Sequence, residues 1–317
     1  MRGYTVTSTR SAVKAFLAIA IWGASFVATK IALEEISPLA VVVVRFVVGL
    51  GTIAVVLAWR HQLRLPHRRD IGWLALLGLN GIAVHQLLQT NGLVTTTATN
   101  SGWIMALIPI LTAVLARMVV GEPFGRLKML GLGVAMFGTL VILGRGVPSF
   151  GLFRAATVGD LLMLASAVNW AVFTVLSKRG LGRYPPGLLI AYIIAFGWLM
   201  TLPLVGVQGG LQQAALMSAR GWAAMLFLGV FCSGLAYAFW YDALAETDAS
   251  ALASFIYLEP VVTSILAATV IGEAITWSVP VGGATILLGV CLVNRRSSAR
   301  SRCRPASAAC SPCCSPC

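Results

Sequence analysis

Long apolar stretches separated by short polar segments recur along almost the whole chain. Each stretch is about 17–25 residues long, which is enough for a helix to cross the roughly 30 Å hydrocarbon core of a bilayer. Ten stretches follow one another, at about residues 13–33, 39–59, 71–93, 98–120, 127–145, 159–178, 187–207, 222–244, 250–271 and 277–294. The short alternating segments of membrane β-barrels are absent. The pattern therefore predicts an all-α integral membrane protein with ten transmembrane helices.

Composition and charge agree with this class. Of the 317 residues 58% are hydrophobic and only 10% are charged, whereas soluble chains carry about 25% charged residues. If the N-terminus is placed in the cytoplasm, most of the 23 lysines and arginines fall in cytoplasmic segments, as the positive-inside rule requires. We therefore expect both termini to be cytoplasmic. The net charge of +13 is explained by this topology, and no nucleic-acid partner is predicted.

An internal repeat divides the chain into two halves. Residues 91–124 align without a gap on residues 242–275, with 11 identical pairs among the 34. Because each half then holds five helices, an odd number, the two copies must enter the membrane from opposite sides. We expect two inverted five-helix repeats. The predicted organisation is an N-terminal arm, a first repeat, an extracytoplasmic linker, a second repeat and a basic, Cys-rich disordered tail, at residues 1–12, 13–145, 146–158, 159–294 and 295–317.

Several short motifs resemble a known family. They are the Ile21–Phe26 string IWGASF, Arg45-Phe46, the string Leu258–Val261 and Gly272-Glu273. Their order across the predicted helices is similar to that of the drug/metabolite transporter superfamily, EamA type. The resemblance covers roughly residues 12–295. It implies a plasma-membrane carrier, often an exporter of amino acids or other small metabolites.

Glu259 is the most informative side chain, because the pattern places it near the middle of the ninth helix. A charge at that depth costs about 2.5–3.5 kcal/mol on insertion scales, so it should face a cavity or a partner. Pro260 follows it, and Pro109 occupies the equivalent position in the first repeat, with Ile108 in place of the glutamate. Helices broken at matched positions indicate a binding site. Glu259 is a candidate for contact with substrate or for proton coupling, and the alternative is a structural glutamate.

Other polar and aromatic residues lie on single faces of the predicted helices. They are expected to line a cavity that binds the substrate, although small and polar residues also gather where membrane helices pack together. His85 is a second candidate for proton coupling, or else a hydrogen-bonded core histidine. The candidate lining residues besides Glu259 are Trp22, Ser25, His85, Gln89, Asn169, Trp170, Tyr237 and Tyr241.

Arg45 lies about six residues into the second predicted helix. It is expected to attract a substrate carboxylate, to pair with Glu34 or Glu35 in the preceding loop, or to pack structurally. No second ligand cluster with zinc-like spacing accompanies the cysteines of the tail, so no metal site is predicted.

The sequence also lacks the motifs of several other functions. No phosphate-binding GxxxxGK[ST] loop, HExxH zinc site or GxSxG nucleophile elbow occurs. We therefore expect a secondary transporter with no cofactor, whose partners are a small-molecule substrate, the lipid bilayer and, as a candidate coupling ion, the proton. Export by alternating access between the two halves is the leading hypothesis. A non-transporting scaffold and an intramembrane enzyme are the alternatives, and the oligomeric state is left open.

Overall fold

The computed structural model describes residues 9–120, 126–143, 157–177, 183–208, 211–246 and 254–302. Within these ranges all regular structure is helical, as the sequence predicted. Five helical stretches of the described chain are long and apolar enough to cross a membrane: Thr9–Leu33, Pro38–Trp59, Arg68–Thr95, Pro186–Val205 and Ala219–Glu246. Shorter apolar helices lie at the positions of the other predicted spans. The number ten and the orientation of the termini stay predictions.

The first repeat begins with two long, unbroken helices and continues in shorter pieces. Its elements are α1 (Thr9–Leu33), α2 (Pro38–Trp59), η1 (Arg68–Asp70), α3 (Ile71–Gly78), η2 (Leu79–Val84), α4 (His85–Thr95), α5 (Ala98–Met105), α6 (Ile108–Val120) and α7 (Arg126–Leu143). Ser37 caps α2 and Thr97 caps α5, each with a side-chain oxygen that accepts a hydrogen bond from a free backbone N–H of the first turn.

The second repeat follows the same order. Its elements are α9 (Val158–Ser177), α10 (Pro186–Gln208), α11 (Leu211–Ala215), α12 (Ala219–Leu226), η3 (Phe227–Ala236), α13 (Tyr237–Glu246), η4 (Ser254–Leu258), α15 (Glu259–Val270) and α16 (Ser278–Arg302). The last helix continues to Arg302, past the boundary expected at residue 294. The cysteines of the predicted tail from Cys303 onward and the predicted linker up to residue 156 lie outside the described residues.

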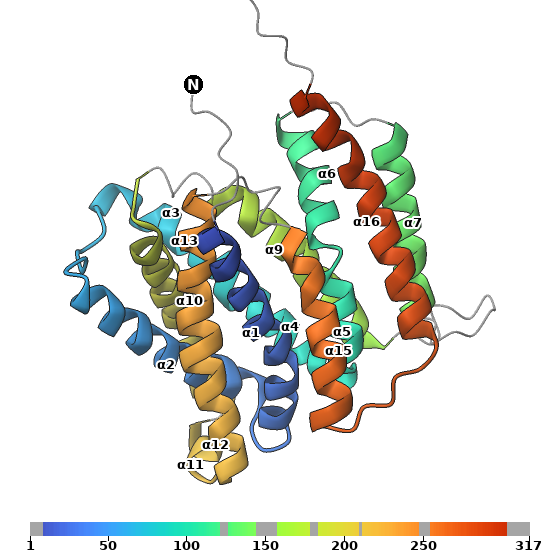
Figure 1. The fold of residues 1–317 in the computed structure, drawn as a ribbon. Helices are drawn as coiled ribbons and strands as arrows, with labels where there is room; N and C mark the ends of the chain where they lie inside the picture. Colours follow the sequence, from blue (N-terminus) through green and yellow to red (C-terminus); the bar gives the residue numbers. More distant parts are fainter. Residues whose placement is uncertain are drawn as a thin grey trace, which may run out of the picture.

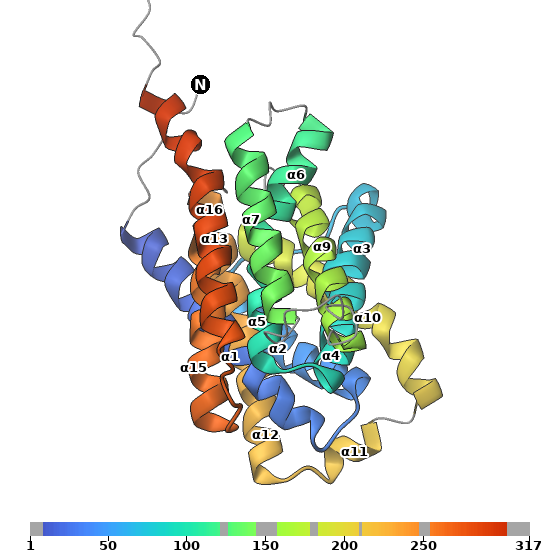
Figure 2. The ribbon, with the colours of Figure 1, turned by 90° about the vertical axis from the view of Figure 1, so that its right-hand side faces the viewer.

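α7 and α16 lie side by side in both views (Figures 1 and 2). A Cβ atom on Gly138 would lie 2.6 Å from the carbonyl oxygen of Gly282, and one on Gly289 would lie 2.5 Å from that of Gly131. The lower-numbered glycine of one helix therefore faces the higher-numbered glycine of the other, so the helices run antiparallel. In the repeat, Gly131 corresponds to Gly282 and Gly138 corresponds to Gly289. If each glycine is replaced by its equivalent, the contact between Gly138 and Gly282 becomes the contact between Gly289 and Gly131, as a two-fold relation requires.

Both prolines of the repeat lie where a helix has just been interrupted. Pro109 is the second residue of α6, which follows a turn after α5, and Pro260 is the second residue of α15, which follows the 3-10 segment η4. Proline suits the first turn of a helix, because the backbone N–H that it lacks has no partner there. A second pair of irregularities, the π-helical segments η2 and η3, was not expected from the sequence. Such segments are frequent at functional sites.

Two carboxylates join the two repeats at one end of the molecule. We call the end at which α1 begins the proximal end and the other the distal end. At the distal end Glu273 accepts hydrogen bonds from the backbone nitrogens of Ala98, at 2.7 Å, and Thr99, at 3.1 Å. Asp160 accepts one from the Thr96 hydroxyl. At the proximal end the repeats are joined at the surface, where Lys14 pairs with Asp242 at 3.2 Å.

Candidate functional site

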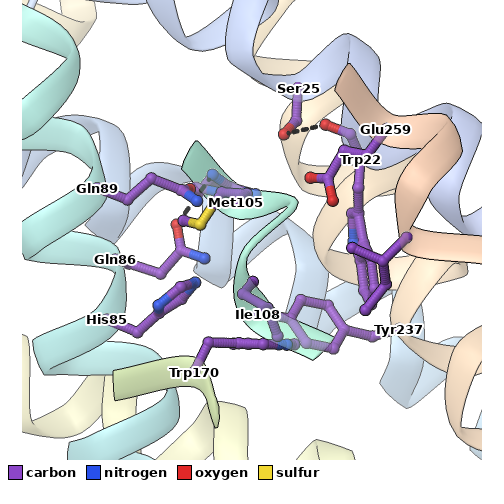
Figure 3. Close-up of a pocket in the computed structure, with 12 residues that line it drawn as sticks. Trp22, Ser25, His85, Gln86, Gln89, Met105, Ile108, Trp170, Tyr237 and Glu259 are labelled. Carbon is purple, nitrogen blue, oxygen red and sulfur yellow. Dashed lines mark hydrogen bonds between the residues drawn. The ribbon is translucent and has the colours of Figure 1, made fainter. Parts of the chain in front are cut away.

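A small cavity lies between the two repeats, at the level of the interrupted helices. Its volume is about 50 Å³, and Figure 3 shows side chains from both halves converging on it. The lining residues are Trp22, Ser25, Arg45, His85, Gln86, Gln89, Met105, Ile108, Trp170, Tyr237, Ile256 and Glu259. Glu259 and Ile108, which are equivalent in the repeat, both belong to the lining. One half thus contributes an acid where the other contributes an apolar side chain.

Glu259 begins α15 and is only 8% exposed. The break in the helix is held against α1, because the hydroxyl of Thr263 donates to the carbonyl oxygen of Gly23, at 2.8 Å, and to that of Glu259, at 2.9 Å. The Glu259 carboxylate forms no hydrogen bond or ion pair with the described part of the chain. A buried acid that faces a cavity without a protein partner is available to a ligand or a proton.

Arg45 is the second buried charge of the cavity, and its side chain is 2% exposed. Its Nε donates to the hydroxyl of Ser233 and its terminal nitrogen to the side-chain oxygen of Gln86, both at 3.1 Å. No carboxylate of the described residues lies within ion-pair distance of the guanidinium. Its two partners are neutral, so the positive charge is oriented by hydrogen bonds and is not neutralised.

The expected pairing of Arg45 with the loop glutamates is wrong. Glu35 accepts hydrogen bonds from the backbone and side chain of Ser218, both at 2.6 Å, and Glu34 lies 4.0 Å from Arg220. Both glutamates follow the end of α1 at the distal surface, whereas Arg45 is two turns into α2 and points into the protein. Proximity along the chain was therefore a poor guide to the partner.

Aromatic rings form one wall of the cavity. Trp22 lies 6.0 Å from Trp170 and 5.2 Å from Tyr237 between ring centroids, with both pairs edge to face. The Trp22 indole donates to the carbonyl oxygen of Cys232 at 3.2 Å, which fixes its orientation. These rings offer apolar surface with directional polar edges, which suits a ligand that carries an apolar group.

His85 lies against the Trp170 ring, with 4.7 Å between centroids. One imidazole nitrogen, Nδ1, is 2.9 Å from the hydroxyl of Ser166 and 3.2 Å from its carbonyl oxygen. The imidazole is thus oriented by α9 of the opposite repeat, while the residue borders the cavity. Gln89 borders the cavity one turn further along α4.

Two of the predicted lining residues lie elsewhere. Asn169 precedes Trp170 on α9, about 100° around the helix, and its amide binds Asn80 at 2.8 Å. Tyr241 is one turn beyond Tyr237 on α13, is 2% exposed, and is not among the residues that line the cavity. The lining residues that the sequence did not single out for the cavity are Gln86, Met105 and Ile256. Gln86 is the polar one, and its position next to His85 was the available signal.

A membrane protein whose described regular structure is helical, and whose two homologous halves enclose a small cavity with polar and aromatic walls, has the architecture of a transporter. The model of the EamA-like transporter family matches residues 9–144 and 157–295. The chain therefore belongs to the EamA-like transporter family, in agreement with the resemblance seen in its motifs.

Comparison with individual proteins gives the same class. The chain is 30% identical over 281 residues to an uncharacterized transporter of Archaeoglobus fulgidus, covering 88% of this chain and 96% of that protein. It is 28% identical to a protein of Streptantibioticus cattleyicolor named "Probable terminal-alkyne amino-acid exporter", covering 90% and 94%. A solved structure shares the fold, with a TM-score of 0.66 at 20% identity, covering 92% of this chain and 98% of that one. The Archaeoglobus and Streptantibioticus relatives carry the names of a transporter and an exporter.

Proposed function

We propose that the protein is a secondary transporter that exports a small zwitterionic metabolite, such as an amino acid, across the plasma membrane. The observation that carries this proposal is the presence of two opposite charges, Arg45 and Glu259, on the lining of one cavity. Neither has an ionic partner among the described residues. An amino acid carries one charge of each sign, so its carboxylate is suited to Arg45 and its ammonium group to Glu259.

Electrostatics favour such a ligand over a singly charged one. Removing a charge from water costs several kcal/mol unless a partner compensates it. A zwitterion compensates both protein charges and is itself compensated, whereas an anion or a cation leaves one charge of the site unpaired. The aromatic wall of Trp22, Trp170 and Tyr237 then contacts the apolar part of the ligand. The name of the Streptantibioticus relative supports the same ligand class.

Movement of one half against the other supplies the transport step. The close backbone contacts between α7 and α16 and the breaks before Pro109 and Pro260 are features that support such motion between repeats. In this proposal Glu259 also carries the coupling proton, and His85 is the second candidate for that role. Substrate binding and protonation then compete for the same carboxylate.

Counterflow in proteoliposomes tests this function. Proteoliposomes that contain the purified protein are loaded with unlabelled amino acid. Uptake of the labelled amino acid is then compared with uptake of the matching labelled amine and the matching labelled carboxylic acid. We expect the zwitterion to be exchanged fastest. Glu259→Gln should abolish the preference for a ligand that carries an ammonium group, and Arg45→Gln the preference for one that carries a carboxylate.

Glu34→Gln serves as the matched control, because it neutralises an exposed carboxylate at the distal surface, outside the lining of the cavity. This variant should retain exchange and the order of preference. If no amino acid exchanges, or if Glu259→Gln and Arg45→Gln both exchange like the unmodified protein, the proposal is wrong.

A further inference from the structure

A second cavity lies at the proximal end, between the segment after α2 and the start of α10. Its volume is about 310 Å³, and no acidic side chain of the described residues lines it. The lining residues are Gln62, Arg64, Leu65, Arg183, Tyr184, Pro185, Leu188 and Tyr192. None of them borders the cavity between the repeats. The transport function proposed above makes no use of this second cavity.

Hydrogen bonds between the two walls hold the second cavity in shape. The hydroxyl of Tyr192 donates to the carbonyl oxygen of Arg64 at 2.6 Å. The hydroxyl of Tyr184 donates to a carboxylate oxygen of Asp70 at 2.7 Å and accepts from the backbone nitrogen of His67 at 3.2 Å. The rings of Tyr184 and Tyr192 contact each other edge to face, with 5.5 Å between centroids. The cavity is therefore formed before any ligand arrives.

The cavity carries a surplus of positive charge. Arg64, Arg68, Arg69 and Arg183 are all exposed along its walls and the adjoining segment. Asp70 compensates one of them, through an ion pair with Arg183 at 2.6 Å. The other three form no ion pair in the described part of the chain. A preformed cavity that is lined by the uncompensated Arg64 and lies beside Arg68 and Arg69 in the adjoining segment is suited to an anion. A phosphate group matches the hydrogen-bonding geometry of guanidinium.

Large exposed apolar side chains lie at the same cavity and in the segment just before it. Leu65, which lines it, is 92% exposed; Trp59 and Leu63, which lie just before it in the chain, are 84% and 56% exposed. A soluble anion would not contact these exposed apolar side chains, whereas the acyl chains of a membrane lipid would cover them. Tryptophan beside arginine is also the usual composition of a protein surface at the level of lipid head groups.

We propose that this cavity is a binding site for the phosphate-bearing head group of an anionic phospholipid. Arg64 and Arg183 contact the phosphate, and Leu65 contacts the acyl chains. The proposal rests on the coincidence of cavity, surplus charge and apolar rim at one place, and it holds whatever the transported substrate is. Basic pockets between helices at a membrane face are known to bind anionic lipids.

Lipid binding to the purified full-length chain tests the proposal. The protein in neutral detergent is titrated with dioctanoyl phosphatidylglycerol, dioctanoyl phosphatidylcholine or inorganic phosphate. Bound lipid is counted by native mass spectrometry and the unfolding temperature is recorded in parallel. We expect phosphatidylglycerol to bind most tightly and to raise the unfolding temperature, and inorganic phosphate at equal concentration to have little effect.

Arg64→Gln is the informative variant, because only the backbone oxygen of Arg64 serves the fold. It should weaken phosphatidylglycerol binding about fivefold, the contribution of one arginine at an anionic surface, and leave phosphatidylcholine binding unchanged. Arg64→Lys keeps the charge and should retain most of the affinity. Arg220→Gln removes an exposed arginine at the distal end and is the matched control, which should bind phosphatidylglycerol like the unmodified protein.

Three outcomes would overturn the proposal. The first is equal binding of the two lipids by the unmodified protein. The second is equal weakening by Arg64→Gln and Arg220→Gln, which would indicate diffuse attraction. The third is tight binding of inorganic phosphate that displaces phosphatidylglycerol, which would assign the cavity to a soluble anion. None of these measurements uses a transported substrate, so their result is independent of the counterflow experiment.

Discussion

Gly23 in α1 and Glu259 in α15 are in backbone contact. A Cβ atom at position 23 would lie 2.9 Å from the carbonyl oxygen of Glu259 and 2.9 Å from the Cβ of Val262. Thr263 strengthens the contact by donating to the carbonyl oxygens of both residues. The carboxylate that faces the cavity is therefore positioned by a glycine in the opposite repeat.

Gly23→Val should displace Glu259 and slow transport without removing any group that contacts the ligand. A shift of about 1 Å in a positioned group costs up to about a hundredfold in rate. The steric overlap at position 23 requires a smaller shift, so we expect about a tenfold loss in the rate of exchange. Counterflow in proteoliposomes measures it. Gly51→Val in α2 is the control, since a Cβ there meets nothing within 4 Å. Equal rates for the two variants would show that the contact has no role.

Ser233→Ala should loosen Arg45. The substitution removes the acceptor of the Nε hydrogen bond and leaves a buried, charged donor unsatisfied, which costs about 1–3 kcal/mol or more. Thermal unfolding in detergent should show a lower midpoint, and exchange of the amino acid should weaken. Thr269→Ala removes an exposed hydroxyl that bonds only to its own helix and should change neither. An unchanged unfolding midpoint in Ser233→Ala would contradict the assigned role.

Gly138→Ala should be destabilising. The added methyl group would lie 2.6 Å from the backbone oxygen of Gly282 and 2.8 Å from the nitrogen of Ile286, so α7 and α16 must separate, at a cost of about 1–3 kcal/mol. Gly133→Ala in the same helix meets nothing within 4 Å and should be neutral or stabilising by up to about 1 kcal/mol. Unfolding midpoints of the two variants test the difference, and the same sign for both would refute the contact.

Glu35 should make stability depend on pH at the distal end. Hydrogen bonds from Ser218, with a smaller effect of Arg220, lower the pKa of this carboxyl group in the folded protein. The stabilisation is complete above the pKa of an unfolded glutamate, about 4.3, and is lost as the pH falls through the lower folded value. Thermal unfolding between pH 7 and pH 3 should show less loss of stability on acidification in Glu35→Gln. Glu34→Gln, in the adjacent exposed position, should retain the loss; if both variants behave alike, the assignment is wrong.

Seven of the nine residues that the sequence proposed as lining residues border one cavity, and their role in binding stays a prediction. Trp22 and Ser25 lie on a face of α1 that a regular 3.6-residue period describes well, whereas Glu259 was placed by its depth along the ninth predicted helix. Asn169 and Tyr241 do not border this cavity. A stripe of polar residues in the sequence shows neither how far a residue is rotated around its helix nor how far along the helix the cavity extends. The cavity ends one turn before Tyr241, and Asn169 meets Asn80 of the π-helical segment η2.

The hydrogen-bond partners of the buried Arg45 could not be predicted from the sequence. The contact of Arg45 with Ser233 joins residues 188 positions apart, and no local rule pairs them. The π-helical segments η2 and η3 carry no composition that distinguishes them from ordinary apolar helix. A π-helical segment rotates the residues that follow it around the helix axis, so α4 and α13 present different faces from those that a regular helix would present. The neighbours of His85 and Tyr237 therefore cannot be predicted from helical periodicity.

The volume of the central cavity, about 50 Å³, has a consequence for selectivity. Such a hollow accommodates about three or four water molecules, fewer heavy atoms than any amino acid possesses. For the proposed amino-acid substrate, the walls must therefore part before it enters. Selectivity among substrates then depends on how completely each one supplies hydrogen-bonding partners to Arg45 and Glu259 after the walls have closed again.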